Sequence, residues 1–196
     1  TVYDDNGEIV YGRECVERII DVSFDDNSKG AVLSSIGADN GSIITKCEKV
    51  SFNSEKSEWK SDPVQTYCMA ASNFDNGALV LGDDKCAYYN SKGNIISSYV
   101  YSGTFAGCDV SGEKAAVILN DDKRRKYSIM LMKDSKSEPF MIYADDELRF
   151  VQIYDELAYV MTKTSLNAYD FDGNLRSTVA ITDSYTKFRR SDKYIF

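Results

Sequence analysis

Three short segments of the chain align with one another without gaps, and they strongly limit its local folding. Each has a Tyr followed by Asp or Asn, a Gly four positions after the Tyr, and then a polar and an apolar residue. The segments are residues 3–10, 89–96 and 169–176. Asp and Asn side chains accept hydrogen bonds from nearby amides, and Gly adopts the left-handed conformation that closes a short loop. The pattern predicts three antiparallel strand–turn–strand hairpins.

The spacing of these hairpins indicates a repeat. Their Gly residues are 86 and 80 residues apart, which is too long for one four-stranded unit. Two weaker copies fill the gaps, K-S-E-W at residues 56–59 and K-S-E-P at residues 136–139. Turns are then expected near residues 7, 57, 93, 137 and 173, at intervals of 36 to 50 residues. Such a period is typical of β-propeller blades.

A second series of apolar strands lies between these turns. Its members each contain a small residue followed by an uninterrupted apolar run, at residues 31–33, 78–81, 116–119 and 158–161. An uninterrupted run indicates a strand that is covered on both faces, as happens when blades stack against each other. Two preceding segments share Asp-Val-Ser, at residues 21–23 and 109–111, which indicates internal homology.

The repeat predicts an all-β chain, a β-propeller of four-stranded antiparallel blades with about four to five blades present. We expect an open arc of a larger ring; the alternative is a closed five-bladed ring, in which the N-terminal strand pair completes the C-terminal one. The prediction treats residues 1–196 as a single domain. Its parts are a half blade at 1–15, blades at 16–65, 66–102, 103–145 and 146–183, and the start of another at 184–196.

Composition narrows the class of partner. The chain has 43% apolar residues, 14 Tyr and 9 Phe but only 2 Pro, a balance that favours strands and a sizeable core. The formal net charge is −8, from 23 basic and 31 acidic residues. A negative chain is repelled by nucleic acid and by anionic membranes. We therefore expect protein or small-molecule partners and no nucleic acid.

Catalysis by histidine is excluded, because the chain has no His. The five cysteines are widely spaced, with no C-x-x-C pair that would indicate zinc or redox chemistry. All five are predicted to lie in strands and to pack in the core, with a disulfide or a reactive thiol as the alternative.

No apolar run is long enough to span a membrane. Both ends of the sequence fall within strand patterns, so we expect a piece of a longer protein.

Three strings carry a resemblance to a known family. They are T-V-Y-D-D-N-G-E-I-V-Y, D-V-S-F-D-D-N-S-K-G-A-V-L-S and A-Y-D-F-D-G-N-L. They resemble a membrane-anchored β-propeller family of Gram-positive gut bacteria, a domain of unknown function. The resemblance implies a propeller outside the cytoplasm and one transmembrane helix that lies outside this chain. More loosely, the repeats are similar to quinoprotein-like and lactonase-like propellers, although Trp59 is the sole Trp and the tryptophan docking motif is missing.

Asp21 and Asp109 are the most interesting carboxylates, because they recur at one position of the predicted inner strand. Propeller sites gather residues from the ends of inner strands, and paired acids can perform hydrolytic chemistry. The competing interpretation is that each Asp caps backbone amides in its blade. Both residues are weak candidates for ligand contact.

Arg124 and Arg125 are the other weak candidates, in the basic run at residues 123–126. The run could contact an anionic polymer, but the two acids that precede it favour a solvated loop.

Two further features are candidate sites. A calcium loop could be formed by Asp170, Asp172 and Asn174, but a plain hairpin turn is favoured. Tyr residues at 99, 101, 143, 154 and 185 could form a binding platform, with blade packing as the alternative.

These observations assign no catalytic, cofactor-binding or metal-ligating residue. They favour a non-enzymatic binding or scaffold propeller of an extracytoplasmic, membrane-anchored bacterial protein, with a protein or a cell-envelope polymer as partner and no cofactor. Contact with the membrane is expected only through an anchor outside this chain. The alternative is a carboxylate- or calcium-dependent hydrolase or lyase with its site at the mouth of the propeller channel. A cytoplasmic repeat scaffold is a third possibility.

Overall fold

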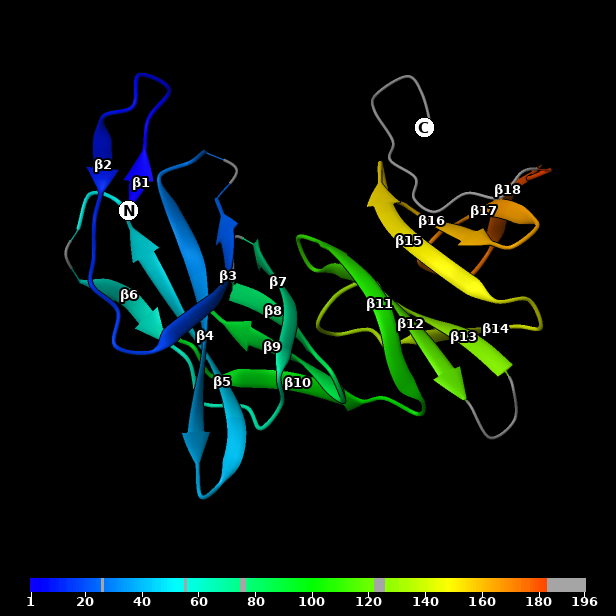
Figure 1. Ribbon diagram of the computed structural model, residues 1–196, viewed down its shortest axis with the longest axis horizontal. Coiled ribbons are helices and arrows are strands. Elements are labelled where there is room, and N and C mark those ends of the chain that lie inside the picture. The colour runs from blue at the N-terminus through cyan, green and yellow to red at the C-terminus, as the bar shows by residue number, and fades with distance from the viewer. Residues whose placement is uncertain (26, 55, 75–76, 122–125, 183–196) are drawn as a thin grey trace. The chain divides into compact units, whose positions relative to one another are not determined.

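The computed structural model describes residues 1–25, 27–54, 56–74, 77–121 and 126–182. Within these ranges the chain forms strands and no helix, as the all-β prediction requires. Four sheets have four antiparallel strands each, and a fifth has two (Figure 1). In every sheet, neighbouring strands are also neighbours in the sequence. Each sheet is therefore a simple up-and-down meander.

The two-stranded sheet pairs β1 (Val2–Tyr3) with β2 (Ile9–Tyr11). The first two four-stranded sheets consist of β3 (Arg18–Phe24), β4 (Gly30–Asp39), β5 (Ser42–Ser51) and β6 (Ser57–Lys60), then β7 (Cys68–Phe74), β8 (Gly77–Gly82), β9 (Lys85–Asn90) and β10 (Ile95–Val100). The other two consist of β11 (Thr104–Ser111), β12 (Lys114–Asp121), β13 (Lys126–Met132) and β14 (Phe140–Ala144), then β15 (Leu148–Tyr154), β16 (Leu157–Thr162), β17 (Ser165–Tyr169) and β18 (Leu175–Ala180).

The chain divides into two compact units, residues 1–100 and 101–196. In the first unit, sheets β3–β6 and β7–β10 pack face to face, and Val32 and Cys47 meet Val80 and Tyr89 in a common core. The second unit repeats this arrangement with sheets β11–β14 and β15–β18. All six residues of β8 are buried, which explains why its sequence is apolar without alternation. The prediction of a single domain stays a prediction, as does ring closure, because residues 184–196 lie outside the described residues.

The structure confirms the three predicted hairpins. Their connecting turns join β1 to β2, β9 to β10 and β17 to β18. In each turn one side-chain oxygen accepts hydrogen bonds from the backbone amides two and four positions later. The oxygen belongs to Asp4, Asn90 or Asp170. The Gly of each turn has a positive φ of 82° to 84°. The repeated sequence thus closes each loop by the same hydrogen bonds.

Two details of the sequence interpretation were wrong. The turn expected near residue 57 lies earlier, where the amide of Ser54 bonds to the carbonyl of Ser51, and Ser57–Lys60 is strand β6. The strand is favoured there because Trp59 packs against the core of the first unit. Cys15 lies outside any strand and is exposed, in a connection that contains one Gly and three charged residues.

Candidate functional site

Asp21 joins two neighbouring sheets of the first unit. It lies on β3, and its carboxylate Oδ1 accepts the amide of Val22 at 2.9 Å. Oδ2 accepts the amide of Ala71, on β7 of the next sheet, at 2.6 Å. Two residues on, the hydroxyl of Ser23 accepts the amide of Asn73 at 2.9 Å. Both oxygens of Asp21 are therefore used by backbone donors.

The position of β7 explains why these bonds are needed. β7 is the end strand of its sheet, so one of its edges carries amides that no strand of that sheet can bond. The Asp and Ser of the Asp-Val-Ser segment project from β3 toward that edge and bond alternate amides. The repeated motif therefore links two sheets rather than capping only its own.

Asp109 performs the same task in the second unit. Its Oδ2 accepts the amide of Ile153, on β15, at 2.6 Å, and the carboxylate also bonds the amide of Val110. Burial raises the pKa of the Asp109 carboxyl above its usual value, and the two amide bonds oppose that shift only partly. Asp21 and Asp109 belong to different compact units. Within the described ranges no group of three or more acids or cysteines is arranged to hold a metal ion.

The remaining sequence candidates give little support for a ligand site. Arg124 and Arg125 lie outside the described residues. In the loop considered for calcium, the carboxylate of Asp170 accepts bonds from Asn174 and Arg176, and Asp172 pairs with Lys133 at 2.9 Å. These donors take up the oxygens that a cation would need, which favours the plain turn. Among the Tyr residues, Tyr101 is buried, Tyr143 is exposed, and residue 185 lies outside the described residues.

Three of the five cysteines pack in the interior. Cys47, Cys68 and Cys86 are buried, Cys108 is half-buried and Cys15 is exposed. Burial raises the pKa of the Cys47 and Cys86 thiols to about 12. These two thiols are therefore protonated at neutral pH and are poor nucleophiles.

A cavity of about 360 Å³ lies between sheets β3–β6 and β7–β10, and we call it the seam pocket. Its charged and aromatic lining residues are Asp25, Lys49, Glu58, Trp59 and Phe74, joined by the amide side chain of Asn73. They come from both sheets: Lys49 lies on β5 directly opposite Trp59 of β6, and Asn73 lies on β7. Sequence reasoning missed this pocket, because its residues come from four separate strands and their connections.

The polar side chains of the seam pocket hold one another in place. The Lys49 ammonium forms an ion pair with the carboxylate of Asp25 and also donates to Asn73 Oδ1 at 3.2 Å. The Asn73 amide nitrogen donates to the same Asp25 oxygen. The Lys49 and Asp25 side chains are only 13% and 20% exposed, so this ion pair is shielded from solvent. A shielded, cross-linked set of this kind is ordered before any ligand arrives.

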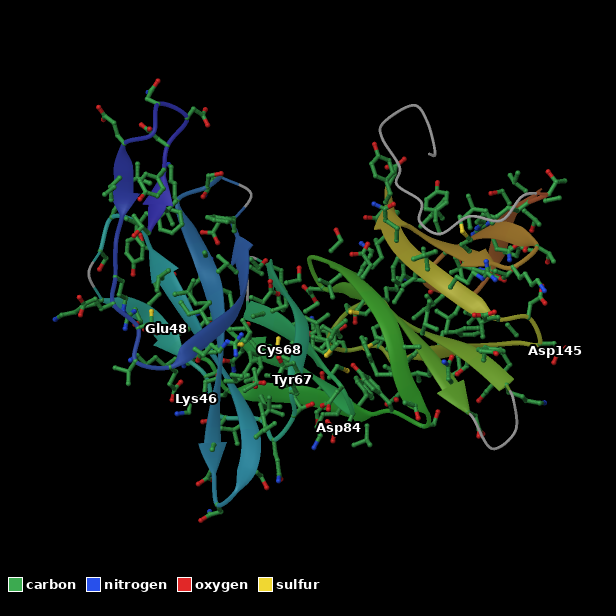
Figure 2. All side chains as sticks on the ribbon, viewed as in Figure 1. Lys46, Glu48, Tyr67, Cys68, Asp84 and Asp145 are labelled. Atoms are coloured by element: carbon green, nitrogen blue, oxygen red, sulfur yellow. The ribbon has the colours of Figure 1, made fainter. Side chains whose placement is uncertain are left out.

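A second cavity, of about 390 Å³, lies on the opposite face of sheet β3–β6 and is crossed by the connection from β2 to β3. Figure 2 shows two of its charged residues, Lys46 and Glu48, both on β5. Lys46 pairs with Glu17 at 2.7 Å, and Glu48 pairs with Arg13 at 2.6 Å. With Glu14 and Lys60, its described lining carries three acids and three bases, so the charges balance and this cavity is the weaker candidate for a ligand.

Comparisons with known proteins agree on the fold. None of the protein-family models compared with the sequence matches it, and neither does any curated protein. Solved structures do match. BamB from Moraxella catarrhalis aligns over 89% of this chain and 53% of its own, with a TM-score of 0.53 and 12% identity. The Neurospora crassa Pan2 WD40 domain aligns over 83% and 50%, with a TM-score of 0.50 and 10% identity.

Chaetomium thermophilum Sqt1, bound to the N-terminus of the ribosomal protein L10, aligns over 79% of this chain and 46% of its own, with a TM-score of 0.54 and 9% identity. WD40 domains are propellers of four-stranded blades. The four-stranded sheets are β-propeller blades. The chain spans about half the length of these propellers, and at such low identity the similarity establishes the fold alone. Within its described part, no helix is long and apolar enough to cross a membrane.

Proposed function

We propose that this propeller chain is a non-enzymatic binding or scaffold module whose partner is a protein. The observation that carries the proposal is the seam pocket, an ordered polar hollow with an aromatic wall at the junction of two blades. Pockets that fix a ligand combine such a wall with a few well-placed polar groups. The Asp21 carboxylate strengthens the junction that holds the pocket, because it links β3 to β7.

The comparisons support a protein as the partner. Sqt1 was solved with a peptide segment of another protein bound to it. Fold analogy does not establish function, so the partner class is our proposal for this chain. A cell-envelope polymer is the competing partner, and the experiment below separates the two.

We also propose that the module works outside the cytoplasm, in a membrane-anchored protein. The support is the resemblance of its hairpin strings to the membrane-anchored propeller family of Gram-positive bacteria. The measurement is the digestion of the complete protein in intact cells by an external protease. Digestion from outside supports the proposal, and protection until the cells are broken contradicts it.

Photo-crosslinking in the native host tests the binding function. A photoreactive phenylalanine analogue replaces Phe74, which lines the seam pocket, or Phe140 on β14 as the matched control. We expect a discrete adduct from position 74 alone, and protease should remove its added mass. An adduct that resists protease but is shortened by glycan hydrolases would identify a polymer instead. Equal adducts at both positions, or none at position 74, would contradict binding at this pocket.

A further inference from the structure

The free charge in the seam pocket is negative. Its lining includes two acids, Asp25 and Glu58, and one base, Lys49. Lys49 and Asp25 neutralise each other in their ion pair. Glu58 is exposed and forms no ion pair with any residue that the structure describes. Among the described lining residues, the charge available to a ligand is therefore the carboxylate of Glu58.

The hydrogen bonds inside the pocket point to the same ligand chemistry. The donors of Lys49 and the amide group of Asn73 are already directed at Asp25 and at each other. A neutral sugar needs a mixture of free donors and free acceptors, and besides Glu58 the described lining offers it only the exposed side chains of Asn27 and Ser91. A carboxylate accepts only, so its complement is a group that only donates. Among protein side chains that are charged at neutral pH, the ammonium of Lys and the guanidinium of Arg have that property.

Trp59 adds a second attraction for a cation. It is next to Glu58 in the chain, lines the pocket and is partly buried against the core of the first unit. The face of an indole ring attracts cations, and Arg also stacks on it. A cavity of about 360 Å³ admits one long side chain with part of its backbone and not a folded domain. The net charge of −8 favours the approach of a basic segment.

We propose that the seam pocket takes a cationic side chain, Arg in preference to Lys, from a basic peptide segment of the protein partner. This inference rests on the proposed binding function. The Glu58 carboxylate pairs with the cation, the Trp59 ring packs on it, and the Lys49–Asp25–Asn73 set holds the wall of the pocket in place.

The fluorescence of the sole Trp reports directly on the pocket. The whole chain is titrated with acetyl-Gly-Arg-Gly-amide, its Lys analogue, the matching Glu peptide and a neutral trisaccharide. We expect a saturable change with the Arg peptide, weaker binding of the Lys peptide, and no change with the other two. Glu58→Gln should lower the affinity for the Arg peptide by up to about fivefold, which is the range that an exposed ion pair contributes. Glu8→Gln, in the exposed turn of the N-terminal hairpin, should leave its affinity unchanged.

The inference would be overturned by the absence of a response to the Arg peptide, by an equal response to the Glu peptide, or by a response to the trisaccharide alone. An unchanged affinity in Glu58→Gln would overturn it as well. The failure of the two proposals is distinguishable. A protease-sensitive adduct at position 74 without any response to the Arg peptide keeps the binding function and removes the cationic ligand. A response to the Arg peptide without a host adduct keeps the cationic ligand and contradicts the proposed binding of a host protein at this pocket.

Discussion

The Asp21 carboxylate bonds the amide of Ala71, fifty positions further along the chain, at 2.6 Å. Asp109 bonds the amide of Ile153, 44 positions further along, at the same distance. In both cases the Asp lies on the first strand of one blade and the amide on the first strand of the next. Within each unit, the first strands of the two blades are thus joined by the same side-chain contact.

Removing this contact destabilises the first unit. Asp21→Ala leaves the amide of Ala71 without its carboxylate partner, and hydrogen bonds to charged groups contribute about 1.5–3 kcal/mol. We expect the free energy of unfolding in urea to fall by that amount. Asp39→Ala, at the exposed end of β4, is the matched control and should change it by less than about 0.5 kcal/mol. Equal losses in the two variants would show that the Asp21 contact contributes nothing specific.

The sequence predicted the blades because their causes are local. The turns depend on Asp4, Asn90 and Asp170 and on the Gly that follows each, all within a few residues. The partner of Asp21 could not be predicted in this way, because blade stacking brings Ala71 to it from fifty positions away. The sequence therefore left both a ligand site and a local cap open, and the repetition of the motif favoured the cap.

The shifted pKa of Asp109 gives a pH dependence of known sign. Burial raises the pKa of this carboxyl in the folded state above its unfolded value near 3.8. The folded state therefore binds more protons than the unfolded state between these two pKa values. The contribution of Asp109 to the free energy of unfolding is complete below about pH 3.8 and is lost as the pH rises through the folded pKa.

Urea unfolding of the native chain and of Asp109→Asn across pH 3.5 to 7 measures this contribution, because the amide of Asn does not titrate. The stability of the native chain relative to the variant should decline with rising pH and then level off. A relative stability that increases over this range would mean that the folded pKa is lowered instead.

Gly93 and Gly7 separate backbone strain from packing. Both have a φ of +82° in equivalent turns. A Cβ on Gly93 would overlap the carbonyl oxygen of Lys60, whereas a Cβ on Gly7 would meet open space. Gly7→Ala should cost about 1 kcal/mol for the left-handed conformation alone. Gly93→Ala should lower the stability more, because the backbone at Lys60 must also move away from the new Cβ. Thermal unfolding of the two variants compares the two losses. Similar losses would show that the turn at Gly93 packs loosely.

The seam pocket lay beyond sequence reasoning for a different reason. Lys49, Trp59 and Asn73 have no common spacing, and each is an ordinary residue of its own strand. Only the register of β5 with β6 and the packing of β7 against β3 and β4 bring them together. The one available signal was that Trp59 is the only Trp, since a large aromatic residue beside charged strand residues is a common feature of binding sites.

The cysteines should react in the order of their exposure. Cys15 is exposed, whereas burial raises the pKa of Cys47 and Cys86 to about 12, so only a minute fraction of those two is thiolate at neutral pH. At pH 7.5 we expect iodoacetamide to label Cys15 within minutes and to reach Cys47 and Cys86 only after urea unfolds the chain. Mass spectrometry of peptides from timed samples locates each label. The variant Cys15→Ser is the control, and it should abolish the fast phase. A fast phase that persists in this variant would place a second reactive thiol on the surface of the folded chain.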